Sequence, residues 1–144
     1  MKPAPSNFPR LSSVAFYDDA GAAIDWLCRA FGFEVRIRID GPDGGILHSE
    51  LTYGEAVLMV ATAGGEKPWP TSPQRAGGCT QAMALYVDDV DTHCQRAEAA
   101  GAVIATRPAD SDHGPGYWAD RSYECVDVGG HHWWFMQRLR DNPA

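Results

Sequence analysis

The side chains that could do chemistry in this sequence are five histidines, four cysteines and many carboxylates. They form no familiar catalytic or metal-binding spacing: there is no CxxC pair, zinc-finger histidine, Ser-His-Asp pattern, Walker loop or GxGxxG. The cysteines lie far apart, at Cys28, Cys79, Cys94 and Cys125. We therefore interpret them as reduced thiols of a cytosolic protein.

The histidines differ in the positions that the sequence predicts for them. His131 and His132 are neighbours in a predicted strand, so their side chains point to opposite faces and do not hold one metal ion together. His48 begins a strand, His93 is predicted on the solvent side of a helix, and His113 lies in a glycine-rich loop. His132 is the best candidate for a hydrogen-bonding or acid-base role, against the more frequent case of a structural histidine.

Hydrophobic periodicity predicts the elements that carry these residues in the first half of the chain. Ile24, Leu27, Cys28 and Phe31 recur at helical spacing, and Gly32 follows where a helix favours a left-handed residue. Turns are predicted at 40–45 and at 54–55. The pattern predicts one strand, one helix and three strands, at residues 11–17, 20–31, 33–39, 46–53 and 56–62.

The second half of the chain repeats this order. Its strand, helix and three strands are predicted at residues 82–87, 90–100, 102–106, 121–127 and 131–137. A loop at 108–116, rich in Gly, Pro and Asp, precedes the fourth of these elements, and a turn at 128–130 precedes the last.

Three landmarks recur at nearly constant spacing, which indicates an internal duplication. They are the pairs Asp18 and Asp88, 70 positions apart, Gly32 and Gly101, 69 apart, and Glu50 and Glu124, 74 apart. We predict a single domain over 1–144, with module one at 11–62, a linker at 63–78 and module two at 79–138. The predicted fold class is α+β, with two βαβββ modules whose curved mixed sheets enclose a cleft and whose helices lie outside.

Charge and hydropathy exclude some functions. The net charge of −7, without a Lys/Arg-rich run, disfavours nucleic acid as a partner. No apolar run suits a signal peptide or a membrane span, so we expect a cytoplasmic protein with no membrane partner. The acidity would favour a cationic ligand, although it more often serves solubility.

Several segments resemble the vicinal oxygen chelate superfamily, also called the glyoxalase/bleomycin-resistance/dioxygenase family. They are residues 17–34, 48–60, 86–91, 98–102 and 120–135. The last, DRSYECVDVGGHHWWF, resembles a signature of the form DRxY…DPxGHxWxF, with Val128 in place of the usual proline. The resemblance spans nearly the whole chain and implies a homodimer, because relatives commonly dimerise.

The resemblance also implies where metalloenzymes of this family place four ligands, which are His, Gln or Glu. The aligned positions here are Ser12, Met59, Ala82 and Trp134. These side chains lack the donors that a hard or borderline divalent ion requires. A register slip of one residue would bring in Gln81 and Trp133, which still gives too few ligands. We therefore predict no metal and no cofactor.

Strand alternation predicts an apolar and aromatic cleft in place of the metal site. If Trp134 points inward, Trp133 and Phe135 face the helix layer. Such a surface suits a flat, partly unsaturated small-molecule ligand; the alternative is that Trp134 and Tyr86 merely fill the cleft. The predicted ligand-binding residues are Ser12, Phe16, Met59, Ala82, Tyr86, Trp118, His132 and Trp134.

Two loops rich in aromatic residues could close the mouth of the cleft. Residues 66–75 carry Trp69, and residues 113–118 carry Tyr117 and Trp118. Covering a subunit interface is an equally good interpretation of both loops.

Three functions fit these observations. We favour a metal-free protein that binds an aromatic, often cationic, drug, as the bleomycin-resistance members do, with no catalytic residue. The alternative is a glyoxalase, isomerase or dioxygenase relative whose metal is held by other residues, such as His48, Glu50, Glu124 and His132. A third interpretation is an interaction module without a ligand.

Overall fold

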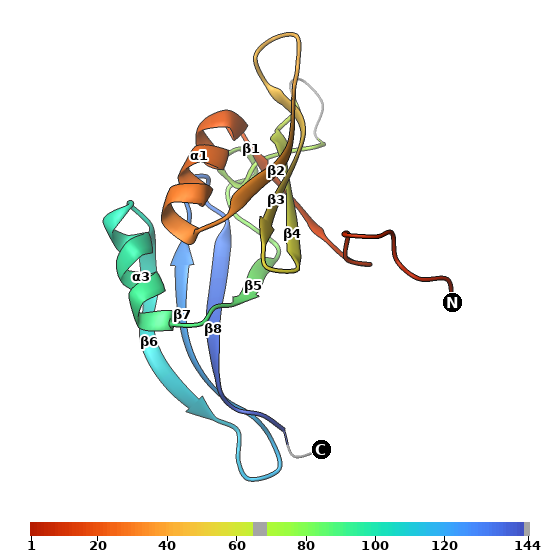
Figure 1. Cartoon of the computed structure of the whole chain (residues 1–144). Coiled ribbons are helices and arrows are strands. Elements are labelled where there is room, and N and C mark those ends of the chain that lie inside the picture. Colours follow the sequence, from red (N-terminus) through yellow and green to blue (C-terminus); the bar gives the residue numbers. More distant parts are fainter. Residues whose placement is uncertain (65–68, 143–144) are drawn as a thin grey trace. The chain divides into compact units, whose positions relative to one another are not determined.

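Each half of the chain forms a four-stranded mixed sheet with a helix packed on one face (Figure 1). The computed structural model describes residues 1–64 and 69–142. The chain divides into unit 1, Met1–Gly78, and unit 2, Cys79–Ala144. The order of elements in both units is βαβββ, so the predicted α+β fold class is confirmed. That the two sheets enclose a cleft remains a prediction, as do the predicted module boundaries.

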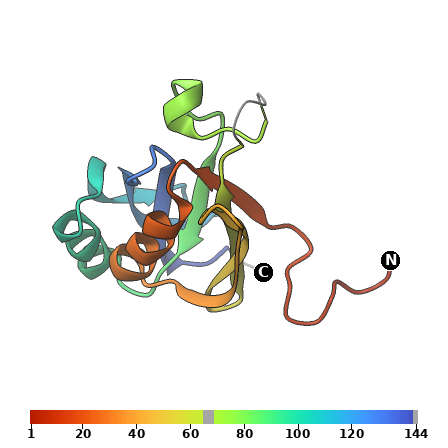
Figure 2. The ribbon, with the colours of Figure 1, turned by 90° about the horizontal axis from the view of Figure 1, so that it is seen from above.

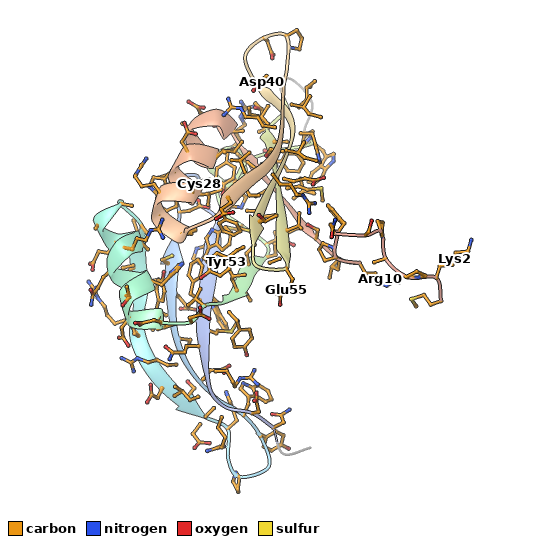
Figure 3. All side chains as sticks on the ribbon, viewed as in Figure 1. Lys2, Arg10, Cys28, Asp40, Tyr53 and Glu55 are labelled. Atoms are coloured by element: carbon orange, nitrogen blue, oxygen red, sulfur yellow. The ribbon has the colours of Figure 1, made fainter. Side chains whose placement is uncertain are left out.

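Unit 1 consists of five principal elements. They are β1 (Ser13–Tyr17), α1 (Ala20–Phe31), β2 (Glu34–Asp40), β3 (Ile46–Tyr53) and β4 (Ala56–Thr62). The sheet order is β1-β4-β3-β2, with β1 parallel to β4 and the other pairs antiparallel. Figure 3 shows Asp40 at one end of the β2–β3 hairpin, and Tyr53 and Glu55 at the opposite end of β3.

Helix α1 begins and ends where its sequence provides caps. The Asp19 carboxylate accepts a hydrogen bond from the backbone N–H of Ala22, and Gly32 ends the helix with φ 84°. Ile24, Leu27 and Phe31 are fully buried, which places the predicted apolar stripe in the core of unit 1.

Unit 2 repeats this construction. Its elements are β5 (Ala82–Tyr86), α3 (Val90–Ala99), β6 (Val103–Asp112), β7 (Ala119–Val126) and β8 (His132–Arg140). The sheet order β5-β8-β7-β6 corresponds to that of unit 1, and α3 packs on one face of the sheet (Figure 1). Asp89 caps α3 by accepting from the backbone N–H of Thr92.

The register of cross-strand partners is the same in the two sheets. In unit 1 one row of partners is Val14, Met59, Glu50 and Ile37. In unit 2 the corresponding row is Ala84, Trp134, Glu124 and Thr106. The duplication that the sequence indicated therefore extends to individual residue pairs.

Strand β8 alternates between the two faces of its sheet as predicted. Trp133 is 2% exposed and Phe135 is fully buried on the side of α3, where their rings stack at 5.6 Å. Trp134, between them in sequence, is 49% exposed on the opposite face. This opposite face, which α3 does not cover, is called the open face below.

The structure differs from the sequence prediction at two places in the loops. Strand β6 continues to Asp112, through part of the predicted loop 108–116, and forms a long hairpin with β7 that reaches beyond α3 (Figure 1). A register shift between Thr106 and Ala109 accommodates Pro108, which lacks a ladder N–H. In the linker, Pro73–Ala76 forms the single turn α2, capped by Ser72 (Figure 2).

His93 is not on the solvent side of its helix, so that prediction was wrong. The side chain is 8% exposed, lies 4.2 Å from Phe135 between ring centroids, and is hydrogen-bonded through Nδ1 to the Tyr123 hydroxyl at 2.7 Å. Val90, His93, Cys94 and Ala97 form the buried stripe of α3. The polar ring occupies a core position because a tyrosine from β7 supplies its partner.

Two further expectations concern the state of the cysteines and the presence of membrane-spanning helices. Cys28, Cys79, Cys94 and Cys125 are all free thiols. Within residues 1–64 and 69–142, the helices are too short or too polar to span a membrane.

Candidate functional site

A groove of about 630 Å³ lies in unit 2, lined mainly by residues of the open face and of the loop between β6 and β7. Its aromatic and thioether side chains are Tyr86, Trp118, Trp134 and Met136. Its charged side chains are Asp120, Glu124 and Arg138. A volume of this size accommodates a small organic molecule.

The pairing of β5, β8 and β7 places the groove's rings. Tyr86 lies opposite Met136, and Trp134 lies between Ala84 and Glu124. Because alternate residues of a strand share a face, Trp134 and Met136 both point to the open side. Tyr86 and Trp134 are 45% and 49% exposed, so a ligand could contact both rings.

Arg138 organises one end of the groove. Its Nε donates to Asp120 Oδ1 at 2.6 Å, and its Nη2 donates to the Tyr86 hydroxyl, which in turn donates to Asp120 Oδ2 at 3.0 Å. The guanidinium also lies 5.0 Å from the Tyr86 ring centroid and 6.0 Å from that of Trp118. Tyr86 and Asp120 raise the pKa of Arg138, so the Asp120–Arg138 pair is internally neutralised.

Glu124 is the groove's other carboxylate, and its surroundings differ. Its Oε2 accepts a hydrogen bond from the Thr106 hydroxyl at 2.8 Å. Within the described parts of the chain, no arginine, lysine or histidine forms an ion pair with it. It is half-buried and lies opposite Trp134 across the β7–β8 ladder.

Glu50 occupies the corresponding position in unit 1 and is neutralised there. Arg36 donates to Glu50 Oε2 through Nε at 2.8 Å and through Nη2, and His48 Nε2 lies 3.2 Å from Oε1. Arg36 and then His48 lower the pKa of Glu50. The two units therefore present the same carboxylate in two different electrostatic environments.

The sequence matches the model of the Glyoxalase/Bleomycin resistance protein/Dioxygenase superfamily over residues 10–135. The chain belongs to this superfamily.

Relatives in the superfamily include proteins similar over most of the chain. An uncharacterised protein of Mycobacterium bovis is 36% identical over 138 residues, which cover 92% of this chain and 86% of the relative. The crystal structure of TioX from Micromonospora sp. ML1 is 32% identical, covers 91% of this chain and 99% of TioX, and has a TM-score of 0.67.

A more distant neighbour shares the fold alone. The fosfomycin resistance protein FosX from Listeria monocytogenes, whose structure contains Mn(II) and sulfate, is 10% identical with a TM-score of 0.61. The alignment covers 90% of this chain and 91% of FosX.

The four positions predicted from the family resemblance to correspond to metal ligands carry side chains that do not suit a divalent ion. Ser12 donates its hydroxyl hydrogen to the Val57 carbonyl at 2.5 Å, and Met59, Ala82 and Trp134 offer a soft thioether, a methyl group and an indole. Among residues 1–64 and 69–142, no three His, Cys, Asp or Glu side chains gather as a metal site would require.

The structure brings together three of the predicted ligand-binding residues, namely Tyr86, Trp118 and Trp134. Ala82 and His132 pair with each other on the open face of unit 2, outside the groove lining. Three of the predicted ligand-binding residues belong to unit 1, namely Ser12, Phe16 and Met59. That they form one site together with the groove residues of unit 2 stays a prediction.

Sequence reasoning did not assign Asp120, Arg138 or an unpaired Glu124 to the groove. The same alternation that placed Trp134 could have placed Asp120 and Glu124, because every second residue of β7 faces the open side. The Arg138–Asp120 pair depends on a long β8, and the prediction ended that strand at residue 137.

The two aromatic loops have different contacts. Trp118 lines the groove and lies 4.8 Å from His113 between ring centroids, whereas Tyr117 is exposed and does not line the groove. Trp69 packs edge-on against Phe16 at 5.3 Å in unit 1. The predicted loop 66–75 also includes residues 66–68, which lie outside the described residues.

Proposed function

We propose that this protein is a metal-independent binding protein of the bleomycin-resistance type, which holds a flat aromatic molecule in the groove of unit 2. The observation that supports this function is the gathering of Tyr86, Trp118, Trp134 and Met136 in one groove of ligand size. In this proposal the protein sequesters its ligand and does not transform it.

The groove is well suited to stacking. An aromatic pair contributes about 0.5–1.5 kcal/mol beyond the area it buries, and both Tyr86 and Trp134 present half-exposed rings. Arg138 contacts Tyr86 and Trp118. Rings held in place by such contacts within the protein lose less conformational freedom on binding, which favours affinity.

Isothermal titration with acridine, a planar three-ring compound, tests the proposal. We expect binding, and we expect Trp134→Ala to weaken it at least about tenfold, about 1.4 kcal/mol, because a stacking partner is lost. Trp134 is half-exposed, so its removal leaves the core intact.

Tyr117→Ala is the control for loss of an exposed ring of unit 2, because Tyr117 does not line the groove and meets Trp118 only edge-on, at 6.4 Å between ring centroids. Equal losses in both variants, or no binding of acridine to the natural protein, would argue against the proposed function. Thermal unfolding of each variant checks that it is folded.

The competing function is a metal-dependent enzyme that holds its metal through residues such as His48 and Glu50, which lie 3.2 Å apart. Elemental analysis of protein purified without a histidine tag separates the two functions. Stoichiometric zinc, nickel, iron or manganese, removed by chelation together with ligand binding, would contradict the metal-independent proposal.

We also propose that the protein acts in the cytoplasm. The support is its four free thiols, which are typical of a reducing compartment. Fractionation of cells that express the tagged protein would show its location.

A further inference from the structure

Unit 1 provides an internal comparison for the charge of the groove. Glu50 and Glu124 are equivalent by register, because each lies opposite the corresponding residue of the neighbouring strand, Met59 or Trp134. Glu50 is paired with Arg36, whereas the hydrogen bond that Glu124 accepts within the described residues comes from the uncharged Thr106 hydroxyl. The cause of this difference can be traced to one position.

Both sheets contain a β-bulge at the same place. In unit 1 the register shifts between Val35 and Ile37, so Arg36 is the extra residue opposite Glu50. In unit 2 it shifts between Ile104 and Thr106, so the extra residue is Ala105. The bulge residue of unit 1 thus provides the cation that neutralises the glutamate, and the bulge residue of unit 2 provides a methyl group.

The remaining charges around Glu124 do not replace the missing cation. Arg138, the groove's own arginine, is held by Asp120 and Tyr86. Arg121, also on β7, forms ion pairs with Asp91 and Asp110. Among the described residues that line the groove, Asp120 and Arg138 form an ion pair, and Glu124 is the carboxylate without an ion-pair partner, beside the Trp134 ring.

We infer that Glu124 makes the groove selective for aromatic cations. The ligand would supply to Glu124 the positive charge that Arg36 supplies to Glu50 in unit 1. This inference rests on the proposed function, since it concerns the same groove. A planar cation would stack on the Trp134 indole and form an ion pair with the Glu124 carboxylate. An uncharged molecule of the same shape would only stack on the indole.

Three compounds with the same ring system test the inference at mildly alkaline pH: 9-aminoacridine, a cation, acridine, which is uncharged, and acridine-9-carboxylate, an anion. We expect the cation to bind about tenfold more tightly than acridine, and the anion to bind more weakly than both. In Glu124→Gln the affinity for acridine is retained and the tenfold preference for the cation is lost.

Glu50→Gln is the matched control, because it removes the same formal charge from the equivalent position. It is expected to retain the preference. If Glu50→Gln reduces the preference as much as Glu124→Gln does, the selectivity arises from the overall acidity of the protein and the inference is wrong.

Ala105→Arg provides a second test that leaves Glu124 in place. Ala105 is exposed, so an arginine fits there and transfers the Arg36–Glu50 arrangement to unit 2. We expect the preference for the cation to fall to about the level of Glu124→Gln; an unchanged preference would contradict the pairing argument.

The outcomes distinguish this inference from the proposed function. Binding of none of the three compounds would reject the proposed function itself. Binding of acridine that depends on Trp134, without any preference for 9-aminoacridine, would reject only the role of Glu124.

Discussion

At the scale of single residues, Asp127 shows how one buried carboxylate positions the strand that carries the groove. Its Oδ1 accepts from the backbone N–H groups of Gly129 and His131, and its Oδ2 accepts from Trp133 Nε1 at 2.9 Å. These bonds fix the turn into β8 and hold the buried indole next to the exposed Trp134. Asp127 therefore contributes to the site without touching it.

We expect Asp127→Ala to lower the free energy of unfolding by about 3 kcal/mol, since it leaves three donors without this acceptor. Asp127→Asn is expected to lose less, because its amide oxygen can still accept from the turn. Denaturant unfolding measures both values. A loss below about 1 kcal/mol in the alanine variant would show that water replaces the carboxylate.

At the scale of elements, the β6–β7 hairpin carries the loop of residues 113–118 that brings Trp118 to the groove. Asp112 closes this hairpin: Arg140 donates to its carboxylate through Nη1 at 2.9 Å and through Nη2, and Gly114 N–H donates at 2.8 Å. Arg140 and then Gly114 lower the pKa of Asp112 from 3.8 to about 2.

The direction of this shift predicts a pH dependence. A carboxyl group whose pKa is lower in the folded state stabilises the fold above its unfolded value of 3.8, and this stabilisation is lost as the pH falls towards about 2. We expect the difference in unfolding free energy between the natural protein and Asp112→Asn to be constant above 3.8 and to shrink below it. A difference that does not vary over this range would contradict the pairing.

The sequence predicted the elements with strong local signals. Helix α1, β3 and β4 have their predicted bounds, because an apolar stripe, a capping aspartate and turn glycines mark them. The full length of β6 could not be predicted from its composition, since Pro108 and its aspartates indicate a loop. Ion pairs with distant arginines, among them Arg121 and Arg140, hold that segment in the sheet.

The candidate site was predictable only in part, for a similar reason. Strand alternation was sufficient for Tyr86 and Trp134, which depend on local periodicity. The Arg138–Asp120 pair depends on strand length and register across β7 and β8. The contrast between Glu50 and Glu124 depends on two bulges. The bulge in β2 could not be predicted from the hydrophobic pattern, because the alternation of Val35, Ile37 and Ile39 continues across it.

At the scale of the whole molecule, we propose that the protein is a homodimer. Strand β2 is the edge of its sheet, all seven of its residues are exposed, and Ile37 and Ile39 are among them. Exposed edge strands with branched apolar residues favour pairing with another chain.

Light scattering coupled to size exclusion is expected to give twice the mass of the chain, and Ile39→Lys is expected to shift the protein towards the monomer. Glu34→Gln, at the other end of β2, makes the same change of one unit in net charge and is the control for charge alone. A monomer at every concentration tested would reject the homodimer.

Adjacent positions in β8 hold two indoles in opposite surroundings, one in the core beside Phe135 and one half in water beside Glu124. The emission of an indole moves to shorter wavelength when water is withdrawn from it. In a protein whose Trp26, Trp69, Trp118 and Trp133 are all replaced by Phe, a guest covering Trp134 would shift the emission to the blue. In a protein that keeps Trp133 in place of Trp134, the single core indole would respond to denaturation. One strand therefore provides separate optical reporters of occupancy and of folding, without an attached dye.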